Sequence, residues 1–177
     1  IEVIAVCVMS NHIHEVLFDR RGEISKFLQE RNAMFANMVK VRYGLPSNVF
    51  DKPDGTYNRL EGTTAIADKI AYAMANPVEA GLVASPEEWP GMISAVEELF
   101  GASTPVKRPR EYLAQDDKTN APTVKFRIGA PKEAVELFGS VTEMATQVAT
   151  HLCKKIKAAR RRHSGNFAGR HQVLATN

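Results

Sequence analysis

Cysteine is scarce in this chain of 177 residues: Cys7 and Cys153 stand alone, in apolar or helical settings and without a paired spacing. This argues against a disulfide framework and a cysteine-based zinc site, and both thiols are expected to be buried or unreactive in a reducing cytosol. No apolar run approaches the roughly 20 residues that span a bilayer, and there is no signal-peptide pattern. The composition, 44% hydrophobic and 24% charged, is typical of one globular domain with an extension.

Acidic residues are absent from 144–177, a stretch that contains seven Lys and Arg residues. The whole chain has a net charge of +3, so the remainder of the chain is net negative. A neutral-to-acidic body with a basic tail favours a polyanionic partner for the tail. The same basic run equally suits a solvated helix end that is stabilised by the helix dipole, and both interpretations stay open.

The N-terminal part is rich in Val and Ile at 2–9 and 12–18, which predicts a pair of strands that meet near residues 10–11. From Glu23 to Tyr43 the apolar residues recur at helical spacing, and Gly44 is well placed to end that helix. We expect this helix to pack on the sheet and to place its Met and Phe side chains in the core.

A second helix is predicted from Ala65 to Asn76, because a proline disfavours helical angles at the residue before it. Asn76 would then lie at a helix end, where its amide is free to bend toward a ligand. The remaining predictions are an extended, hairpin-like piece at 48–60 with its turn at 52–55, a short helix at 91–100, a strand at 124–128, and an amphipathic helix from 131 to about 162.

His12 and His14 form the first chemical signal. Side chains alternate along a strand, so the two imidazoles are expected to point to the same face, where they can share one metal ion. Taken alone, such a pair is more often ordinary sheet surface than a metal site.

Tyr72 and Asn76 add a second signal. Asp68, Tyr72 and Asn76 are each four residues apart and would form one row along the predicted helix. Two imidazoles and an amide oxygen suit Mg²⁺ or Mn²⁺, which can polarise a phosphodiester for attack by the phenol. A phenol ordinarily has a pKa of about 10, so it needs help from the metal or from a nearby base. Without the histidine pair, Tyr72 would be interpreted as a half-buried helix aromatic.

Three blocks of the sequence closely resemble the HUH single-tyrosine transposases, and within them the REP-associated tyrosine transposases. The blocks are Val8–His14, Tyr72–Val83 and Glu88–Pro90, and the resemblance covers roughly residues 1–95. It implies a ferredoxin-like α/β (α+β) domain with an antiparallel sheet and packed helices. It also implies metal-dependent cleavage and strand transfer of single-stranded DNA, at hairpin-marked sites and in a homodimer.

The resemblance also implies residue roles. His12 and His14 would hold the metal at the centre of the sheet, and Asn76 matches the position of the third ligand. Tyr72 matches the nucleophile, which would form a 5′-phosphotyrosine intermediate. Ser10 departs from the family, which usually has proline before Asn-His; this loosens the turn without removing a ligand.

The family domain begins with a strand and a helix that lie upstream of this sequence, so we expect a sheet that lacks its first strand and has an exposed edge. The predicted organisation is an N-terminally truncated catalytic domain at 1–100, a Pro-rich linker or arm at 101–130, and an amphipathic basic helix and tail at 131–177. A chain truncated in this way is expected to be either a fragment of a longer gene product or a decayed copy, and the two differ in whether this chain is active.

Basic residues near the site and in the tail are candidate DNA contacts: Arg59, Lys69, Lys154, Lys155, Arg160, Arg161 and Arg162. Two other functions stay open. A domesticated or decayed hairpin-DNA-binding protein would bind despite chelation and form no covalent product. A metal phosphodiesterase that uses water would still cleave after Tyr72→Phe. A cytoplasmic, nucleoid-associated protein with no membrane partner is expected in each case.

Overall fold

The computed structural model describes residues 1–46, 49–50, 57–107 and 123–176, which form two compact units. Unit 1 consists of Ile1, Asp19–Arg59 and Ser103–Arg127, and unit 2 consists of Glu2–Phe18, Leu60–Ala102 and Ile128–Asn177. Within the described ranges, none of the helices combines the length and the apolar character that crossing a membrane requires.

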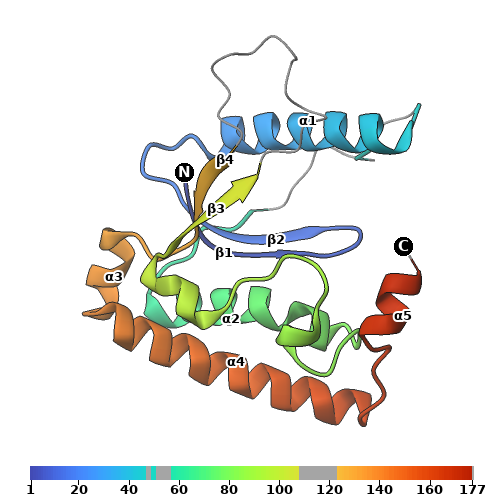
Figure 1. Cartoon of the computed structure of the whole chain (residues 1–177). Coiled ribbons are helices and arrows are strands. Elements are labelled where there is room, and N and C mark those ends of the chain that lie inside the picture. The colour runs from blue at the N-terminus through green and yellow to red at the C-terminus, as the bar shows by residue number, and fades with distance from the viewer. Residues whose placement is uncertain (47–48, 51–56, 108–122, 177) are drawn as a thin grey trace. The chain divides into compact units, whose positions relative to one another are not determined.

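In its described residues the chain is a mixed α/β protein with two small antiparallel sheets, each of two strands. In chain order its elements are β1 (Glu2–Val8), β2 (Ile13–Phe18), α1 (Ile24–Tyr43), α2 (Thr63–Glu79), η1 (Pro86–Glu88), η2 (Val96–Phe100), β3 (Ser103–Lys107), β4 (Thr123–Arg127), α3 (Lys132–Phe138), α4 (Val141–His163) and α5 (Arg170–Ala175) (Figure 1).

The predicted N-terminal strand pair is confirmed as the antiparallel hairpin β1–β2 in unit 2. Its two-residue loop is Ser10-Asn11, closed by a 2.8 Å hydrogen bond from the Met9 N–H to the His12 carbonyl. In the register of the pair, Cys7 lies opposite His14. The four central residues of β1 are buried, so this strand is the one that the rest of unit 2 covers.

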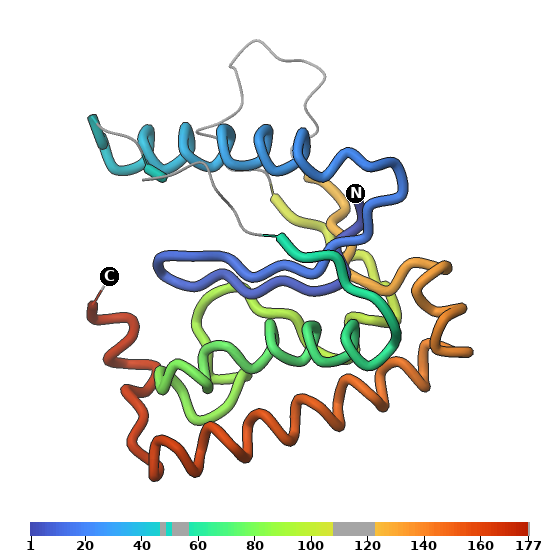
Figure 2. Tube along the Cα trace, turned by 180° about the vertical axis from the view of Figure 1, so that it is seen from behind, coloured from blue at the N-terminus to red at the C-terminus, as the bar shows by residue number. Residues whose placement is uncertain are grey.

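Helix α2 lies between the hairpin and α4 in both views of unit 2 (Figures 1 and 2). Ile70 and Met74 on α2, and Met144 and Val148 on α4, are at most 1% exposed and belong to one apolar cluster. Small alanines on the same helix are fully buried too, which allows the two helices to approach closely. This packing holds α2 rigidly beside the histidine-bearing hairpin.

The prediction that α2 ends at Asn76 is wrong: the helix continues through Pro77 to Glu79. A proline removes one backbone donor and crowds the preceding turn, at a cost of about 3 kcal/mol in a helix interior. Pro77 and Val78 are both among the fully buried side chains, and the apolar area they bury offsets that cost. Asn76 therefore lies within the last turns of the helix rather than at a free end.

The single helix predicted from 131 to about 162 is also wrong, since two helices occupy this stretch. The break lies at Gly139, whose φ of 85° leaves the helical region. Ser140 then caps α4, its hydroxyl accepting a 3.1 Å hydrogen bond from the Glu143 N–H. A glycine followed by a serine predicts the end of one helix and the N-cap of the next. The prediction from the apolar periodicity alone overlooked this pair.

Unit 1 contains α1 and the β3–β4 pair. Helix α1 ends at Gly44, as predicted, but it buries none of its residues, and Met34 is 61% exposed. The expectation that its Met and Phe residues form core is therefore wrong. The predicted strand at 124–128 is confirmed as β4. The predicted turn at 52–55 lies outside the described residues.

The C-terminal part of the chain packs into unit 2 through a second apolar cluster. Its buried members are Cys7, Met9, Val78, Val83, Trp89, Ala159 and Val173. Trp89 is 6% exposed, and its indole N–H donates a 3.1 Å hydrogen bond to the Val8 carbonyl, so this side chain packs within unit 2. Because Ala159 and Val173 belong to this cluster, the end of α4 and α5 are part of the folded unit.

Gly81 lies where the end of α4 meets the segment after α2. Its φ is +73°, and a Cβ built there would lie 2.8 Å from Cε1 of His163. The ring of His163 is itself held by a 2.9 Å hydrogen bond from Nε2 to the Glu79 carbonyl. Gly81→Ala thus combines backbone strain with a clash, and we expect it to lower the free energy of unfolding by about 2–4 kcal/mol in urea titration.

Gly139→Ala is the matched control, because Gly139 also has a positive φ but has nothing within 4 Å of the position of the added Cβ. It carries the strain without the clash, so its cost should stay at about 1–2 kcal/mol. Equal losses for the two variants would contradict close packing of the C-terminal segment at Gly81.

The two thiols should differ sharply in reactivity. Cys7 is fully buried, and burial raises the pKa of its thiol to about 12, whereas Cys153 is exposed on α4. Because the thiolate is the reactive form, a maleimide should label one thiol of the folded protein and two after denaturation. Mass spectrometry should place the native label on Cys153; rapid native labelling of Cys7 would contradict the buried β1.

Candidate metal and tyrosine site

The hairpin places the two histidines side by side. His12 ends the loop and His14 follows in β2, and their Nε2 atoms are 3.0 Å apart. The rings meet edge to face, with centroids 4.7 Å apart. The prediction that both imidazoles share one face of the hairpin is confirmed, and the reason is local: alternation along an extended backbone.

Asn11 orients the first of the two rings. Its Oδ1 lies 2.6 Å from Nδ1 of His12, and because an amide oxygen accepts, this contact is made by the tautomer of His12 whose Nε2 is free for a ligand. The two Nε2 atoms of the pair lie within hydrogen-bond distance of each other. The sequence interpretation missed this role of Asn11, although an Asn directly before a ligand histidine is a visible signal.

Burial, and secondarily the charge of His12, lower the pKa of His14 below its ordinary value. The neutral imidazole is the form that binds metal, so this environment favours ligation. His12 itself is exposed at the loop, which leaves one side of the pair open to a ligand.

The histidine pair could hold one divalent ion, because its two Nε2 atoms converge to 3.0 Å. In the described part of the chain, no group of three or more His, Cys, Asp or Glu side chains could hold a metal. The amide oxygen of Asn76 is the further protein ligand predicted from the sequence, and water or substrate oxygens would complete the coordination.

Tyr72 is brought to the histidine pair by α2. Its ring lies edge to face with His14, with centroids 5.2 Å apart. Tyr72 is half-buried, and among the described tyrosines it is the one in unit 2, since Tyr43 and Tyr57 belong to unit 1. Tyr112 lies outside the described residues. The structure thus joins a strand and a helix that are almost sixty residues apart in sequence.

Asn76 lies one helical turn beyond Tyr72 and is 6% exposed. Since α2 continues past it, Asn76 does not lie at a helix end, so the freedom predicted for its amide at such an end does not apply. Its role as a third ligand stays a prediction.

Two lysines approach the Tyr72 ring, one from each helix. Nζ of Lys69 is 5.4 Å and Nζ of Lys155 is 5.5 Å from the ring centroid, within the range of cation–π attraction. Lys69 is exposed on α2, whereas the side chain of Lys155, on α4, is 19% exposed.

Asp68 connects α2 to α4 beside the tyrosine. Its Oδ1 accepts a 2.9 Å bond from Nζ of Lys155 and lies 3.2 Å from Nδ1 of His151. Burial alone would raise the pKa of Asp68, but the hydrogen bonds from Lys155 and His151 outweigh it and lower the pKa below its usual range. The Asp68 carboxylate is therefore ionised at neutral pH and forms an ion pair with the Lys155 ammonium. His151 and Lys155 are four residues apart on one helix, but sequence alone gave no sign of which element they would face.

The other predicted DNA contacts separate into internal and exposed groups. Arg160 Nε donates a 2.8 Å hydrogen bond to the Ala84 carbonyl, so this guanidinium is used within unit 2. Lys154, Arg161 and Arg162 are exposed on α4. Arg59 belongs to unit 1.

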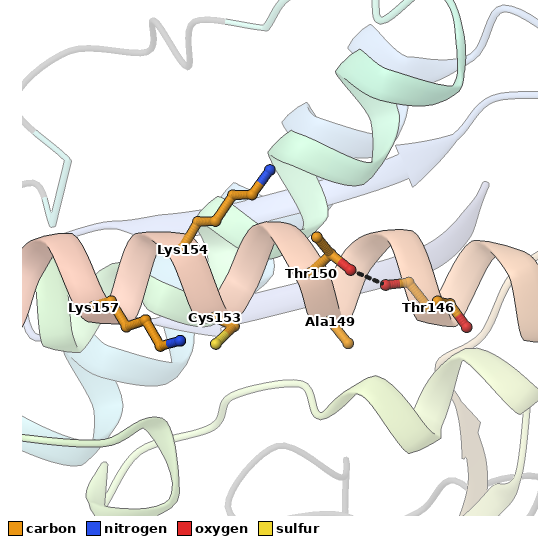
Figure 3. A pocket seen from close by; sticks show the side chains of 6 residues that line it. All are labelled: Thr146, Ala149, Thr150, Cys153, Lys154 and Lys157. Atoms are coloured by element: carbon orange, nitrogen blue, oxygen red, sulfur yellow. Dashed lines mark hydrogen bonds between the residues drawn. The ribbon is translucent and has the colours of Figure 1, made fainter.

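A shallow hollow on α4 is separate from this site. It is lined by Thr146, Ala149, Thr150, Cys153, Lys154 and Lys157, and the Thr150 hydroxyl donates to the Thr146 carbonyl at 2.8 Å (Figure 3). Among the described residues, no hydrogen bond, ion pair or ring contact joins the lining of this hollow to the histidine pair or to Tyr72. The hollow is therefore not part of the candidate site.

Comparisons of the chain with protein-family models, with curated proteins and with solved structures found no match.

Proposed function

We propose that this chain is an HUH-type single-stranded DNA transposase in which Tyr72 is the nucleophile and His12, His14 and Asn76 hold Mg²⁺ or Mn²⁺. The observation that carries the proposal is the contact of the Tyr72 ring with His14, 5.2 Å between centroids. It brings the Tyr72 ring against one of the two rings of the histidine pair. The proposal includes a ferredoxin-like arrangement of the complete domain, a homodimer, and hairpin-marked single-stranded DNA as substrate.

The reaction is an exchange of one phosphodiester for another. The Tyr72 oxygen forms a bond to phosphorus, the bond from phosphorus to the 3′ oxygen breaks, and the released strand ends in a 3′ hydroxyl. The phenol proton passes to solvent or a nearby base, and the 3′ oxygen gains one. A bound divalent ion would polarise the phosphodiester and offset its charge. The phosphotyrosine keeps the energy of the broken bond, so a second 3′ hydroxyl can reverse the step and join strands.

His14 and Tyr72 have different roles in this reaction, His14 as a metal ligand and Tyr72 as the nucleophile. His14, positioned by β2 and with its pKa lowered by burial, would supply one imidazole nitrogen to a bound ion. Tyr72 is fixed by α2, which packs between the hairpin and α4, so attack needs little reorganisation of the protein.

A hairpin-DNA-binding protein without catalysis is the second candidate. Lys154, Arg161 and Arg162 form an exposed basic stretch on α4, and phosphate contacts from such a stretch need neither metal nor tyrosine. This candidate uses only the electrostatics of the C-terminal helix and leaves the convergent histidines without a role.

A covalent-adduct assay tests the first proposal. The protein is mixed with 5′-³²P- and 3′-fluorophore-labelled single-stranded hairpin DNA and Mn²⁺ or Mg²⁺, then denatured in detergent. The expected result is that the 3′ fluorophore migrates with the protein, because the 5′-phosphotyrosine retains the 3′ part of the strand. This signal should disappear when a chelator is added. DNA binding that survives chelation, with no adduct under any metal, would overturn the transposase proposal in favour of the second candidate.

A further inference from the structure

Lys155 differs from the other lysines of the basic run in what it faces. Lys154 and Lys157 line the hollow on α4 (Figure 3), whereas Lys155 pairs with Asp68 on α2. Its side chain is 19% exposed, its Nζ is 2.9 Å from Asp68, and the same Nζ is 5.5 Å from the centre of the Tyr72 ring. One ammonium therefore pairs with the Asp68 carboxylate and lies over the ring of the proposed nucleophile.

We propose that Lys155 is a catalytic cation of the Tyr72 site, which contacts the scissile phosphate, and that Asp68 is the residue that positions it. This inference rests on the proposed function and assigns a reaction role to the helix that the sequence interpretation treated as a DNA-binding extension. The proposed phosphate site is then incomplete without α4, so the hairpin, α2 and α4 of unit 2 all contribute residues to the active site.

The geometry leaves room for this role. An ammonium has three donors, and the Asp68 contact uses one of them, so two are left for phosphate oxygens. The phosphate must approach Tyr72 for attack, and Lys155 already lies over that ring. An anchored cation loses little side-chain entropy when substrate arrives, unlike a lysine in solvent.

Asp68 and His151 account for the anchoring. Asp68 Oδ1 is shared by Lys155 and His151, so the carboxylate is held from α4 at two points one turn apart. Lys155 transfers no proton in this step. It stabilises the negative charge on the non-bridging oxygens while the bond to Tyr72 forms and the bond to the 3′ oxygen breaks.

A structural ion pair between two helices is the competing explanation, and single-turnover adduct formation separates the two. Lys155→Met keeps the apolar stem of the side chain and removes the ammonium. It should lower the rate at saturating DNA by about 10–100-fold, the order of magnitude for loss of one charge-stabilising donor. Lys155→Arg, which keeps a positive charge, should recover part of that rate.

Lys157→Met is the matched control, since two residues along a helix correspond to about 200° of rotation and so to the opposite face. It should leave the rate at saturating DNA within about twofold of wild type. Asp68→Asn keeps Lys155 but removes its charged anchor, and should give an intermediate loss in rate at saturating DNA. Thermal unfolding of each variant reports the structural contribution separately.

The outcomes separate this inference from the proposed function. If wild-type protein forms a metal-dependent adduct and Lys155→Met reacts as fast as Lys157→Met, Lys155 is only a structural tie and the inference is overturned. If Lys155→Met loses rate and Lys155→Arg regains it at unchanged stability, the inference stands. If wild-type protein forms no adduct at all, the proposed function and the inference fall together.

Discussion

Tyr72→Phe is expected to abolish the covalent protein–DNA adduct and to slow strand cleavage by at least about a thousandfold, as loss of a nucleophile does in other covalent mechanisms. The substitution removes one oxygen and keeps the ring that lies against His14. Folding, metal binding and DNA affinity should therefore stay close to wild type. Adduct is measured as label that migrates with protein in denaturing gels, and cleavage as the shortened strand.

Tyr43→Phe is the matched control, because Tyr43 is 71% exposed in unit 1. It makes the same chemical change outside the site and should leave the adduct yield unaltered. Three results are informative if Tyr72→Phe behaves otherwise. Unchanged cleavage without adduct would identify water as the nucleophile and support the metal phosphodiesterase. An adduct that persists would assign the nucleophile to another tyrosine. Loss of DNA binding would indicate that the hydroxyl contacts DNA.

His14→Ala has the second largest expected effect: loss of metal-dependent adduct formation by more than about a hundredfold. The side chain supplies one of two convergent imidazole nitrogens, and it also contacts Tyr72. Isothermal titration with Mn²⁺ should show binding by the wild type and a large loss of affinity in the variant. Adduct formation at wild-type rate by His14→Ala would show that the metal assignment is wrong.

His171→Ala serves as the control for a lost imidazole, since His171 is exposed on α5.

The pH dependence of Mn²⁺ binding gives an independent check of His14 as a ligand. Protonation competes with metal, and the pKa of His14 is lowered, so ligation should persist below the pH at which an ordinary histidine protonates, about 6.5. Protonation of His14, followed by NMR, should then weaken Mn²⁺ binding only as the pH drops through its lowered pKa. Protonation of His14 centred above pH 6.5 would contradict its buried setting.

Much of the local structure was readable from the sequence. The strand pair, its turn near residues 10–11 and the stop of α1 at Gly44 all depend on period-two alternation or on glycine at a positive φ, which are local properties. The errors arose where packing overrides local preference. Burial of Pro77 and Val78 carries α2 past a residue that usually ends helices. In α1, helical spacing of apolar residues correctly predicted the helix but did not establish that its stripe is buried.

The sequence by itself determined the convergence of His12 and His14, because two side chains at alternate positions on one extended strand must share a face. It also determined that Asp68 and Tyr72 lie in one helical row. Only the tertiary structure decided that this row meets the histidines, that Tyr72 contacts His14, and that Lys155 from α4 pairs with Asp68. These contacts join segments far apart in the chain. They depend on how α2 packs between the hairpin and α4, and no local pattern specifies that packing.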